Sequence, residues 1–129
     1  METITYLDTH LVVWLHAGQI DLIPHPVRDI LESSSLLLSP MVDLELEYLF
    51  EIGRVIEPAF EVRQNLDSKL NTRTCNLDFG AVASEACRQT WTRDPFDRII
   101  TGQAAVNNAQ LLTKDKKIRD NYANAIWGD

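Results

Sequence analysis

Short apolar runs alternate along the chain with segments in which apolar residues recur every three or four positions. The runs predict strands, whereas the three-and-four spacing predicts helices. We expect strands at residues 4–7, 36–38, 75–77, 110–113 and 125–127, and helices at 9–15, 26–32, 40–52, 58–70, 79–91, 95–106 and 118–122. Regular alternation of this kind is typical of a parallel sheet with helices on both faces. We therefore expect an α/β fold, a three-layer α/β/α sandwich with a central, mainly parallel sheet.

Helix boundaries are marked by residues with defined capping roles. Ser39-Pro40 and Asp94-Pro95 each combine a side chain that can cap a helix with a proline suited to the first helical position. Gly53 is a natural stop for the helix that begins at Pro40. The chain of 129 residues has the length of one domain of ordinary size, so we expect a single domain over residues 1–129.

Composition supports a folded protein outside the membrane. Hydrophobic residues make up 45% of the chain, and its longest apolar runs are far shorter than the roughly 20 residues of a membrane-spanning helix. The first residues lack the features of a secretory signal, so we expect a cytoplasmic protein. In that compartment Cys75 and Cys87 are expected to be free thiols.

The overall charge does not favour binding to polyanions. Twelve basic and nineteen acidic residues give a net charge of −7. If the chain binds RNA, it must therefore use a local basic rim or bound cations. Six basic residues could form such a rim, although a solvated surface run is the alternative: Arg93, Arg98, Lys114, Lys116, Lys117 and Arg119.

Two aspartates follow predicted strands directly, at the positions where parallel α/β sheets gather functional groups. Asp8 follows the run 4–7, and Asp115 follows the run 110–113. If these strands are neighbours, the two carboxylates lie at the same edge of the sheet. The sequence therefore indicates a candidate cation site.

A third acid stands out within the helix that begins at Pro40. Glu45 shares a helical line with Leu49, Ile52 and Ile56, and we expect this line to face the core. A carboxylate there is unfavourable unless it is paired or bound to a metal. A different line, formed by Glu47, Glu51 and Arg54, is typical of a solvated face, and we assign it no function.

Asp94 and Asp97 occupy the cap and third positions of their helix, so each can be either a cap or a ligand. Several carboxylates that converge without a cation would repel one another, whereas Mg²⁺ and Mn²⁺ favour all-oxygen surroundings. Convergence of these acids would therefore imply a divalent metal.

Four acid-containing segments follow one another along the chain. They are Tyr6-Leu-Asp8-Thr9-His10, Ser39-Pro-Met-Val-Asp-Leu-Glu45, Arg93-Asp94-Pro-Phe-Asp97-Arg98 and Leu111-Leu-Thr113-Lys-Asp115. This order resembles bacterial PIN-domain toxins of VapBC-type toxin–antitoxin pairs over nearly the whole chain. The third segment, with Ala104-Ala105 after it, is the most specific.

The resemblance implies a metal-dependent endoribonuclease that binds Mg²⁺ or Mn²⁺ and leaves a 5′-phosphate and a 3′-hydroxyl. It also implies a homodimer and inhibition by a small antitoxin protein. Asp8, Glu45, Asp97 and Asp115 match the acidic metal-binding quartet of the family, and Asp94 matches a further acid common in this subgroup. One departure is that Asp43, Glu45 and Glu47 alternate where the family usually has a single obvious acid.

The sequence leaves open the roles of several residues near the acids, and it leaves rival functions for the chain. Thr9 and Thr113 can orient a carboxylate or be ordinary strand-end residues. Trp14 and Trp91 are expected to pack rather than to stack on bases. The rival functions are a catalytically inactive PIN-like binding module, a receiver-like phospho-signalling domain and an aspartate-nucleophile phosphatase. The phosphatase would require a second acid two residues after Asp8, where His10 stands instead.

Overall fold

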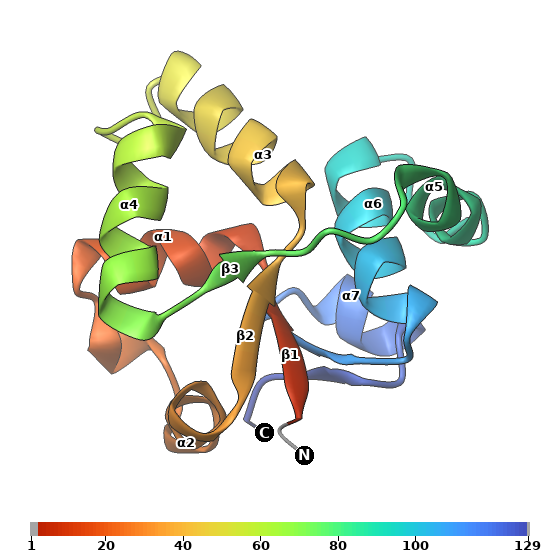
Figure 1. The fold of residues 1–129 in the computed structure, drawn as a ribbon, viewed down its shortest axis with the longest axis horizontal. Coiled ribbons are helices and arrows are strands. Elements are labelled where there is room, and N and C mark those ends of the chain that lie inside the picture. The colour runs from red at the N-terminus through yellow and green to blue at the C-terminus, as the bar shows by residue number, and fades with distance from the viewer. Residues whose placement is uncertain (1–2, 129) are drawn as a thin grey trace.

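A single parallel sheet forms the centre of the computed structural model, which describes residues 3–128 (Figure 1). In this part of the chain its strand order is β3-β2-β1-β4-β5, and every neighbouring pair is parallel. The strands are β1 (Ile4–Leu7), β2 (Ser35–Leu38), β3 (Arg73–Thr74), β4 (Gln110–Leu112) and β5 (Ala125–Ile126). From β1 the chain adds β2 and then β3 on one side of β1, and afterwards adds β4 and β5 on its other side. The direction in which strands are added therefore changes between β1 and β4, which makes this the topological switch point of the sheet.

Helices cover both faces of this sheet. Figure 1 shows the first four helices on one side and the last three on the other, which confirms the three-layer α/β/α sandwich. They are α1 (Thr9–Ala17), α2 (His25–Ser33), α3 (Pro40–Glu51), α4 (Ala59–Leu70), α5 (Phe79–Cys87), α6 (Pro95–Val106) and α7 (Lys116–Asn121), with a short 3₁₀ helix η1 (Ile20–Leu22) after α1. None of the helices within residues 3–128 is long and apolar enough to cross a membrane.

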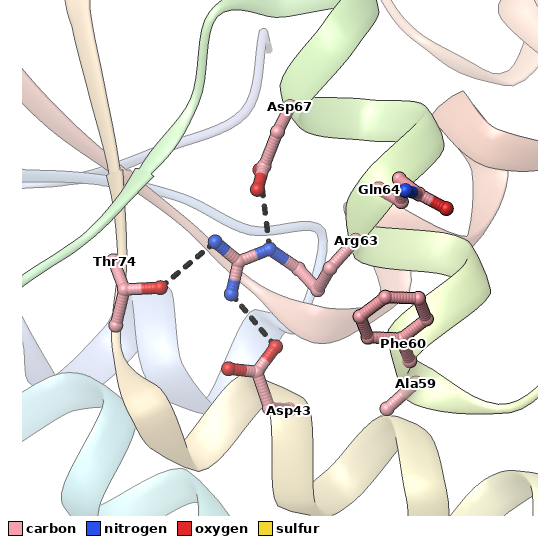
Figure 2. A pocket seen from close by; sticks show the side chains of 7 residues that line it. All are labelled: Asp43, Ala59, Phe60, Arg63, Gln64, Asp67 and Thr74. Atoms are coloured by element: carbon pink, nitrogen blue, oxygen red, sulfur yellow. Dashed lines mark hydrogen bonds and ion pairs between the residues drawn. The ribbon is translucent and has the colours of Figure 1, made fainter.

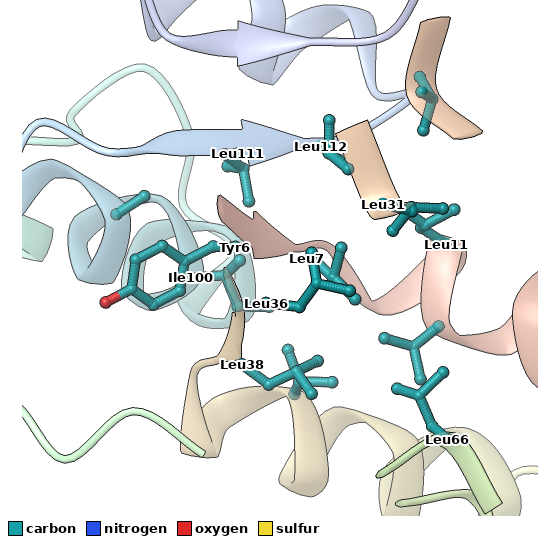
Figure 3. Packing of buried hydrophobic residues seen from close by; sticks show 14 of the residues in the cluster. Tyr6, Leu7, Leu11, Leu31, Leu36, Leu38, Leu66, Ile100, Leu111 and Leu112 are labelled. Carbon is teal, nitrogen blue, oxygen red and sulfur yellow. The ribbon is translucent and has the colours of Figure 1, made fainter. Parts of the chain in front are cut away.

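The apolar side chains of the central strands form the core. Leu7 of β1 and Leu111 and Leu112 of β4 are fully buried, as is Leu38 of β2 (Figure 3). Because β1 is covered on both faces, its apolar run is nearly continuous, as expected for a central parallel strand. This packing fixes the carboxyl ends of β1 and β4 relative to each other, with Leu7 in register with Leu112.

Two predicted elements differ from the structure. The short strand expected at 75–77 lies instead at Arg73–Thr74, and its pairing continues only as far as the Cys75 amide, which donates to the Leu38 carbonyl at 2.8 Å. Arg73 and Thr74 are exposed and polar, so no apolar run marks this edge strand. The buried Cys75 is followed by an irregular segment.

The helix expected at 79–91 ends early, at Cys87. Its last carbonyls are taken by a side chain from the next helix, since the Arg98 guanidinium donates to the backbone oxygens of Ala86 and Cys87 at 3.1 and 3.2 Å. The α5 and α6 helices also pack closely at Gly102, where an added Cβ would lie 2.9 Å from the Ala86 nitrogen. A tertiary contact therefore accompanies the end of α5, and no glycine or proline marks this helix end in the sequence.

Candidate active site

Asp8 lies where β1 ends and α1 begins, at the topological switch point. Asp8 is only 4% exposed. One carboxylate oxygen accepts from the Thr9 amide at 2.8 Å, and the other accepts from the Thr113 hydroxyl, just after β4, at 2.6 Å. The strands that precede Asp8 and Asp115 are thus neighbours, which is the condition under which the sequence places both carboxylates at one edge of the sheet. The hydrogen bond between Asp8 and Thr113 joins the two strand ends directly.

Burial raises the pKa of the Asp8 carboxyl. The hydrogen bonds from Thr113 and Thr9 and the nearby His10 oppose this rise in pKa, whereas the charge of Asp115 adds to it. The ionised carboxylate is thus incompletely compensated in the described structure. A buried acid in this state is typical of functional sites, where a bound cation favours the charged form.

Asp94 and Asp115 each cap the helix that follows them. Asp94 Oδ1 accepts from the amides of Phe96 and Asp97 at 2.8 and 3.2 Å, at the start of α6. Asp115 Oδ1 accepts from the Lys117 amide at 2.8 Å, at the start of α7. In each case the cap uses Oδ1. Capping therefore holds these acids in place at helix ends whose dipoles favour negative charge.

Asp97, one turn into α6, shows that the acids approach one another. Its pKa is raised to about 7, first by burial and then by the negative charges of four other carboxylates, Asp94, Asp8, Asp115 and Glu45. Every one of the five acids singled out in the sequence therefore takes part in one electrostatic group, to which we refer as the acidic cluster. A carboxyl with a pKa near 7 in such a group is poised to exchange its proton for a cation.

Glu45 joins the acidic cluster from α3, although the prediction that its helical line faces the core is wrong. Its helical line does not face the core, because Ile52 is 48% exposed and Ile56, which lies beyond the helix, is 95% exposed. The core face of α3 is formed by Val42 and Leu46. Glu45 is half-buried instead against the neighbouring acids.

Burial also raises the pKa of the Glu45 carboxyl, and the charges of Asp8 and Asp94 raise this pKa further. The Thr9 hydroxyl and His10 act in the opposite direction on the same carboxyl. The Thr9 hydroxyl is itself buried and close enough to affect Glu45, but its geometry falls short of a full hydrogen bond. Thr9 thus faces the acidic cluster from the first turn of α1.

The three alternating acids of α3 have separate surroundings. Figure 2 shows the Arg63 guanidinium of α4 between Asp43, Asp67 and Thr74, with Arg63 Nη1 2.7 Å from Asp43 Oδ1. Arg63 is only 8% exposed, and its bonds to Asp67 and Thr74 are 3.3 and 2.9 Å long. Asp43 therefore pairs with a buried cation, away from the acidic cluster. Nothing in the sequence pattern singled out this ion pair.

Glu47 corrects the expectation of a solvated face. It is half-buried, and its Oε1 accepts from the Ala59 amide at 3.0 Å. Pro58 at the cap position of α4 has no side chain that can accept a hydrogen bond, so Glu47 takes over the capping of α4. Glu51 and Arg54 are exposed, as expected. Of the three alternating acids, Glu45 is the one that approaches the other site residues.

We expect Glu47→Ala to lower the free energy of unfolding by about 1 kcal/mol, the usual cost of losing a helix cap. Glu51→Ala, an exposed change on the same helix, provides the matched control and should leave stability within about 0.5 kcal/mol of the original. Urea denaturation of the two variants measures both values. Equal stability of Glu47→Ala and the control would remove the capping role.

The donor set of the acidic cluster fits a hard divalent cation. All five candidates offer carboxylate oxygens, which Mg²⁺ and Mn²⁺ prefer. Burial, and then the charges of neighbouring carboxylates, raise the pKa values of Asp8, Glu45 and Asp97. Within residues 3–128, no three His, Cys, Asp or Glu side chains are already close enough to hold a metal ion. Water molecules, which Mg²⁺ usually retains, or small rotamer changes would have to complete such a site.

The basic residues near the site in sequence are partly engaged in the fold. Lys116 pairs with Asp120 at 2.9 Å, and Arg119 donates to the Lys114 carbonyl at 3.1 Å. The Lys114 ammonium lies 5.5 Å from the centre of the Trp14 ring. Arg98, as described above, ends α5. A role of these cations in binding RNA stays a prediction.

The two tryptophans considered for base stacking make contacts within the fold, and both cysteines are free. Trp14 packs on Trp127 with ring centroids 5.8 Å apart, and the partly buried Trp91 donates to Gln89 at 2.8 Å. Both observations agree with the expected packing roles. Cys75 and Cys87 are free thiols, the first buried and the second exposed.

Comparison with known proteins identifies the family and the fold. The family model described as PIN domain matches residues 5–124. No curated protein sequence matches the chain significantly. The solved structures show the same fold at low sequence identity.

VapBC-1 from nontypeable Haemophilus influenzae is 19% identical with a TM-score of 0.67, and 98% of each chain is covered. DNA-bound VapBC from Salmonella typhimurium is 19% identical with a TM-score of 0.61, covering 97% of this chain and 96% of the other. A toxin–antitoxin complex from Klebsiella pneumoniae is 16% identical with a TM-score of 0.59, and 95% of each chain is covered. Identities this low establish similarity of fold alone.

Proposed function

The chain belongs to the PIN domain family, and from this membership and the acidic cluster we propose that it is a metal-dependent endoribonuclease. The observation that carries the proposal is the placement of five carboxylates at the carboxyl ends of β1 and β4 and on the adjoining helices α3 and α6. There burial, and then the charges of four neighbouring carboxylates, raise the pKa of Asp97 to about 7. Ordinary surface acids do not gather in this way, because the like charges destabilise the fold. Clustered carboxylates can bind divalent cations, and such cations can in turn bind a phosphodiester.

In the proposed site, Asp8, Glu45, Asp97 and Asp115 would hold one or two Mg²⁺ or Mn²⁺ ions, directly or through water, and Asp94 would support the site from its cap position. When bound, such an ion lowers the pKa of a water molecule and compensates the charge of the phosphodiester. The hydrogen bond from Thr113 fixes the orientation of the Asp8 carboxylate. The Thr9 hydroxyl lowers the pKa of the Glu45 carboxyl and so favours its ionised form.

The proposed reaction is hydrolysis of an RNA phosphodiester bond. The oxygen of water forms a new bond to phosphorus, and the bond from phosphorus to the 3′ oxygen breaks. The 3′ oxygen leaves with a proton, so the products are a 3′-hydroxyl and a 5′-phosphate. A 2′,3′-cyclic phosphate would instead require attack by the ribose 2′-hydroxyl and would contradict this mechanism.

The biological setting is part of the same proposal. The similar solved structures are a toxin–antitoxin complex from Klebsiella pneumoniae and VapBC complexes from two other bacteria, which supports a VapC-like toxin inhibited by a small antitoxin protein. We propose that this pair acts in the cytoplasm. We also propose a homodimer. Exposed apolar side chains support it: Leu44 and Phe79 are 56% and 69% exposed and border an apolar cavity of about 370 Å³ between α3, α5 and α6.

Two rival functions are less well supported. A receiver-like domain has the strand order 2-1-3-4-5, whereas the order here is β3-β2-β1-β4-β5. A catalytically inactive PIN-like binding module would retain the fold without needing the acidic cluster. The presence of all five acids favours the enzyme.

The direct test is incubation of the purified protein with mixed cellular RNA and Mg²⁺ or Mn²⁺, with EDTA as the metal-free arm. We expect fragments that carry 5′-phosphates, and no cleavage with EDTA. A suitable charge control is Asp21→Asn, because Asp21 is exposed on η1 and outside the acidic cluster. Cleavage that persists undiminished in EDTA would contradict the proposal, and a complete lack of cleavage and of RNA binding would favour the inactive module.

A further inference from the structure

Two aromatic side chains join the helices that carry the candidate catalytic acids. The rings of Tyr48, on α3, and Phe96, on α6, have centroids 5.7 Å apart and planes inclined by 37°. Phe96 is half-buried and packs against the hydrophobic core, whereas Tyr48 is 46% exposed. The pair therefore has an inner ring packed against the core and an outer ring exposed to solvent.

This pair borders the acidic cluster. Tyr48 follows Glu45 by three residues, which places both on neighbouring parts of the same helix face. Phe96 lies between Asp94 and Asp97 in the first turn of α6, and its amide is capped by Asp94. Aromatic surface is thus available directly beside the carboxylates at which the phosphodiester would be cleaved.

The charge of the chain makes such a surface important for an RNA substrate. The net charge is −7, and the acidic cluster itself repels phosphate groups unless cations are bound. Contacts to phosphate alone therefore supply little affinity near the cluster. Stacking of a base on an aromatic ring does not depend on charge, and it occurs with every base.

We propose that Tyr48, supported by Phe96, is a stacking platform for an unpaired nucleobase next to the phosphodiester that is cleaved. This inference rests on the proposed ribonuclease function and narrows its substrate to RNA in single-stranded segments or loops. In a duplex the bases are stacked on one another and their faces are inaccessible, whereas unpaired bases can turn out onto an aromatic side chain.

Binding of fluorescent single-stranded RNA of randomised sequence tests the platform. A matched chain of ribose phosphates without bases serves as the second probe. Both are measured by anisotropy with Mg²⁺ in the Asp8→Asn background, which prevents cleavage under the proposed mechanism. For Tyr48→Ala we expect roughly tenfold weaker binding of the RNA and unchanged binding of the baseless probe.

Two variants control for effects on the fold. Tyr48→Phe keeps the ring and should bind RNA as tightly as the parent. Phe50→Ala removes a partly exposed aromatic side chain from the same helix, two residues away and outside the Tyr48–Phe96 pair, and should leave RNA binding unchanged. Thermal unfolding of each variant identifies any loss of structure.

The outcomes separate this inference from the function on which it rests. If the protein without substitutions cleaves RNA but Tyr48→Ala binds RNA like the parent, or weakens equally on both probes, the platform is wrong and the ribonuclease stands. If the unsubstituted protein neither cleaves nor binds RNA, both are wrong. Equal affinity for duplex and single-stranded RNA would also overturn the platform.

Discussion

Asp8→Asn is expected to reduce metal-dependent RNA cleavage by more than about 100-fold. Loss of a residue that only orients a metal ligand typically costs 10–100-fold, and Asp8 is proposed to be a ligand itself. At the same time, the variant should be more stable than the parent in the absence of metal. Asn has the same shape and stays neutral, whereas burial makes the ionised carboxylate unfavourable and raises the Asp8 pKa.

The combination of lost activity and gained stability is the informative result. We expect the free energy of unfolding in EDTA to rise by about 0.5–2 kcal/mol, the range common for single stabilising substitutions. Cleavage rates and urea denaturation measure the two effects in the same preparation. Asp21→Asn, which makes the same chemical change at an exposed position, should alter neither. An Asp8→Asn variant that cleaves RNA normally would remove Asp8 from the catalytic residues.

Most of the fold could be predicted from the sequence because its strong local patterns agree with the tertiary structure. The apolar run that ends at Leu7 and the cap-and-proline pairs at Ser39 and Asp94 each specify an element boundary by themselves. The parts that could not be predicted depend on distant residues. The α5 helix ends at Cys87 because Arg98 takes its carbonyls, and the edge strand at Arg73 is defined by pairing with β2.

The candidate site was predictable for a different reason. Asp8 and Asp115 follow strands whose carboxyl ends must lie at one edge of a parallel sheet, so their approach depends on topology more than on side-chain detail. For Glu45 the sequence reasoning chose a residue that approaches the cluster, but on the wrong premise, since its helical line leads to the exposed Ile52. Choosing among the acids of α3 required the partners of Asp43 and Glu47, which lie on or next to α4.

Helix capping explains why these acids can coexist before any cation binds. Asp8, Asp94 and Asp115 each precede a helix and accept hydrogen bonds from its first amides. The helix dipoles offset part of the repulsion at these three positions. Asp97 lacks the cap position, and burial, followed by the charges of the four neighbouring carboxylates, raises its pKa. The acidic cluster should therefore respond to pH through Asp97 and also through Asp8 and Glu45, whose pKa values are raised as well.

The second large effect is expected from pH. In the folded protein without metal, Asp97 has a pKa of about 7, compared with 3.8 for the ordinary carboxyl. Between these values the folded state holds a proton that the unfolded chain has released, so the free energy of unfolding falls as pH rises. The raised pKa values of Asp8 and Glu45 contribute with the same sign. We therefore expect the metal-free protein to lose stability from about pH 4 to about pH 7.

Divalent cations should reverse this loss because they bind the ionised carboxylates of the folded state only. The gain in melting temperature on adding Mg²⁺ should be largest above pH 7 and small near pH 5, where protons compete with the cation. Asp97→Asn should flatten the pH dependence in EDTA and reduce the Mg²⁺ effect, whereas Asp21→Asn should change neither. Denaturation curves across this pH range, with EDTA or Mg²⁺, provide the measurement. The prediction would be contradicted if the free energy of unfolding in EDTA rose with pH, with the same slope in Asp97→Asn. Ionisation of the acidic cluster would then not destabilise the metal-free fold.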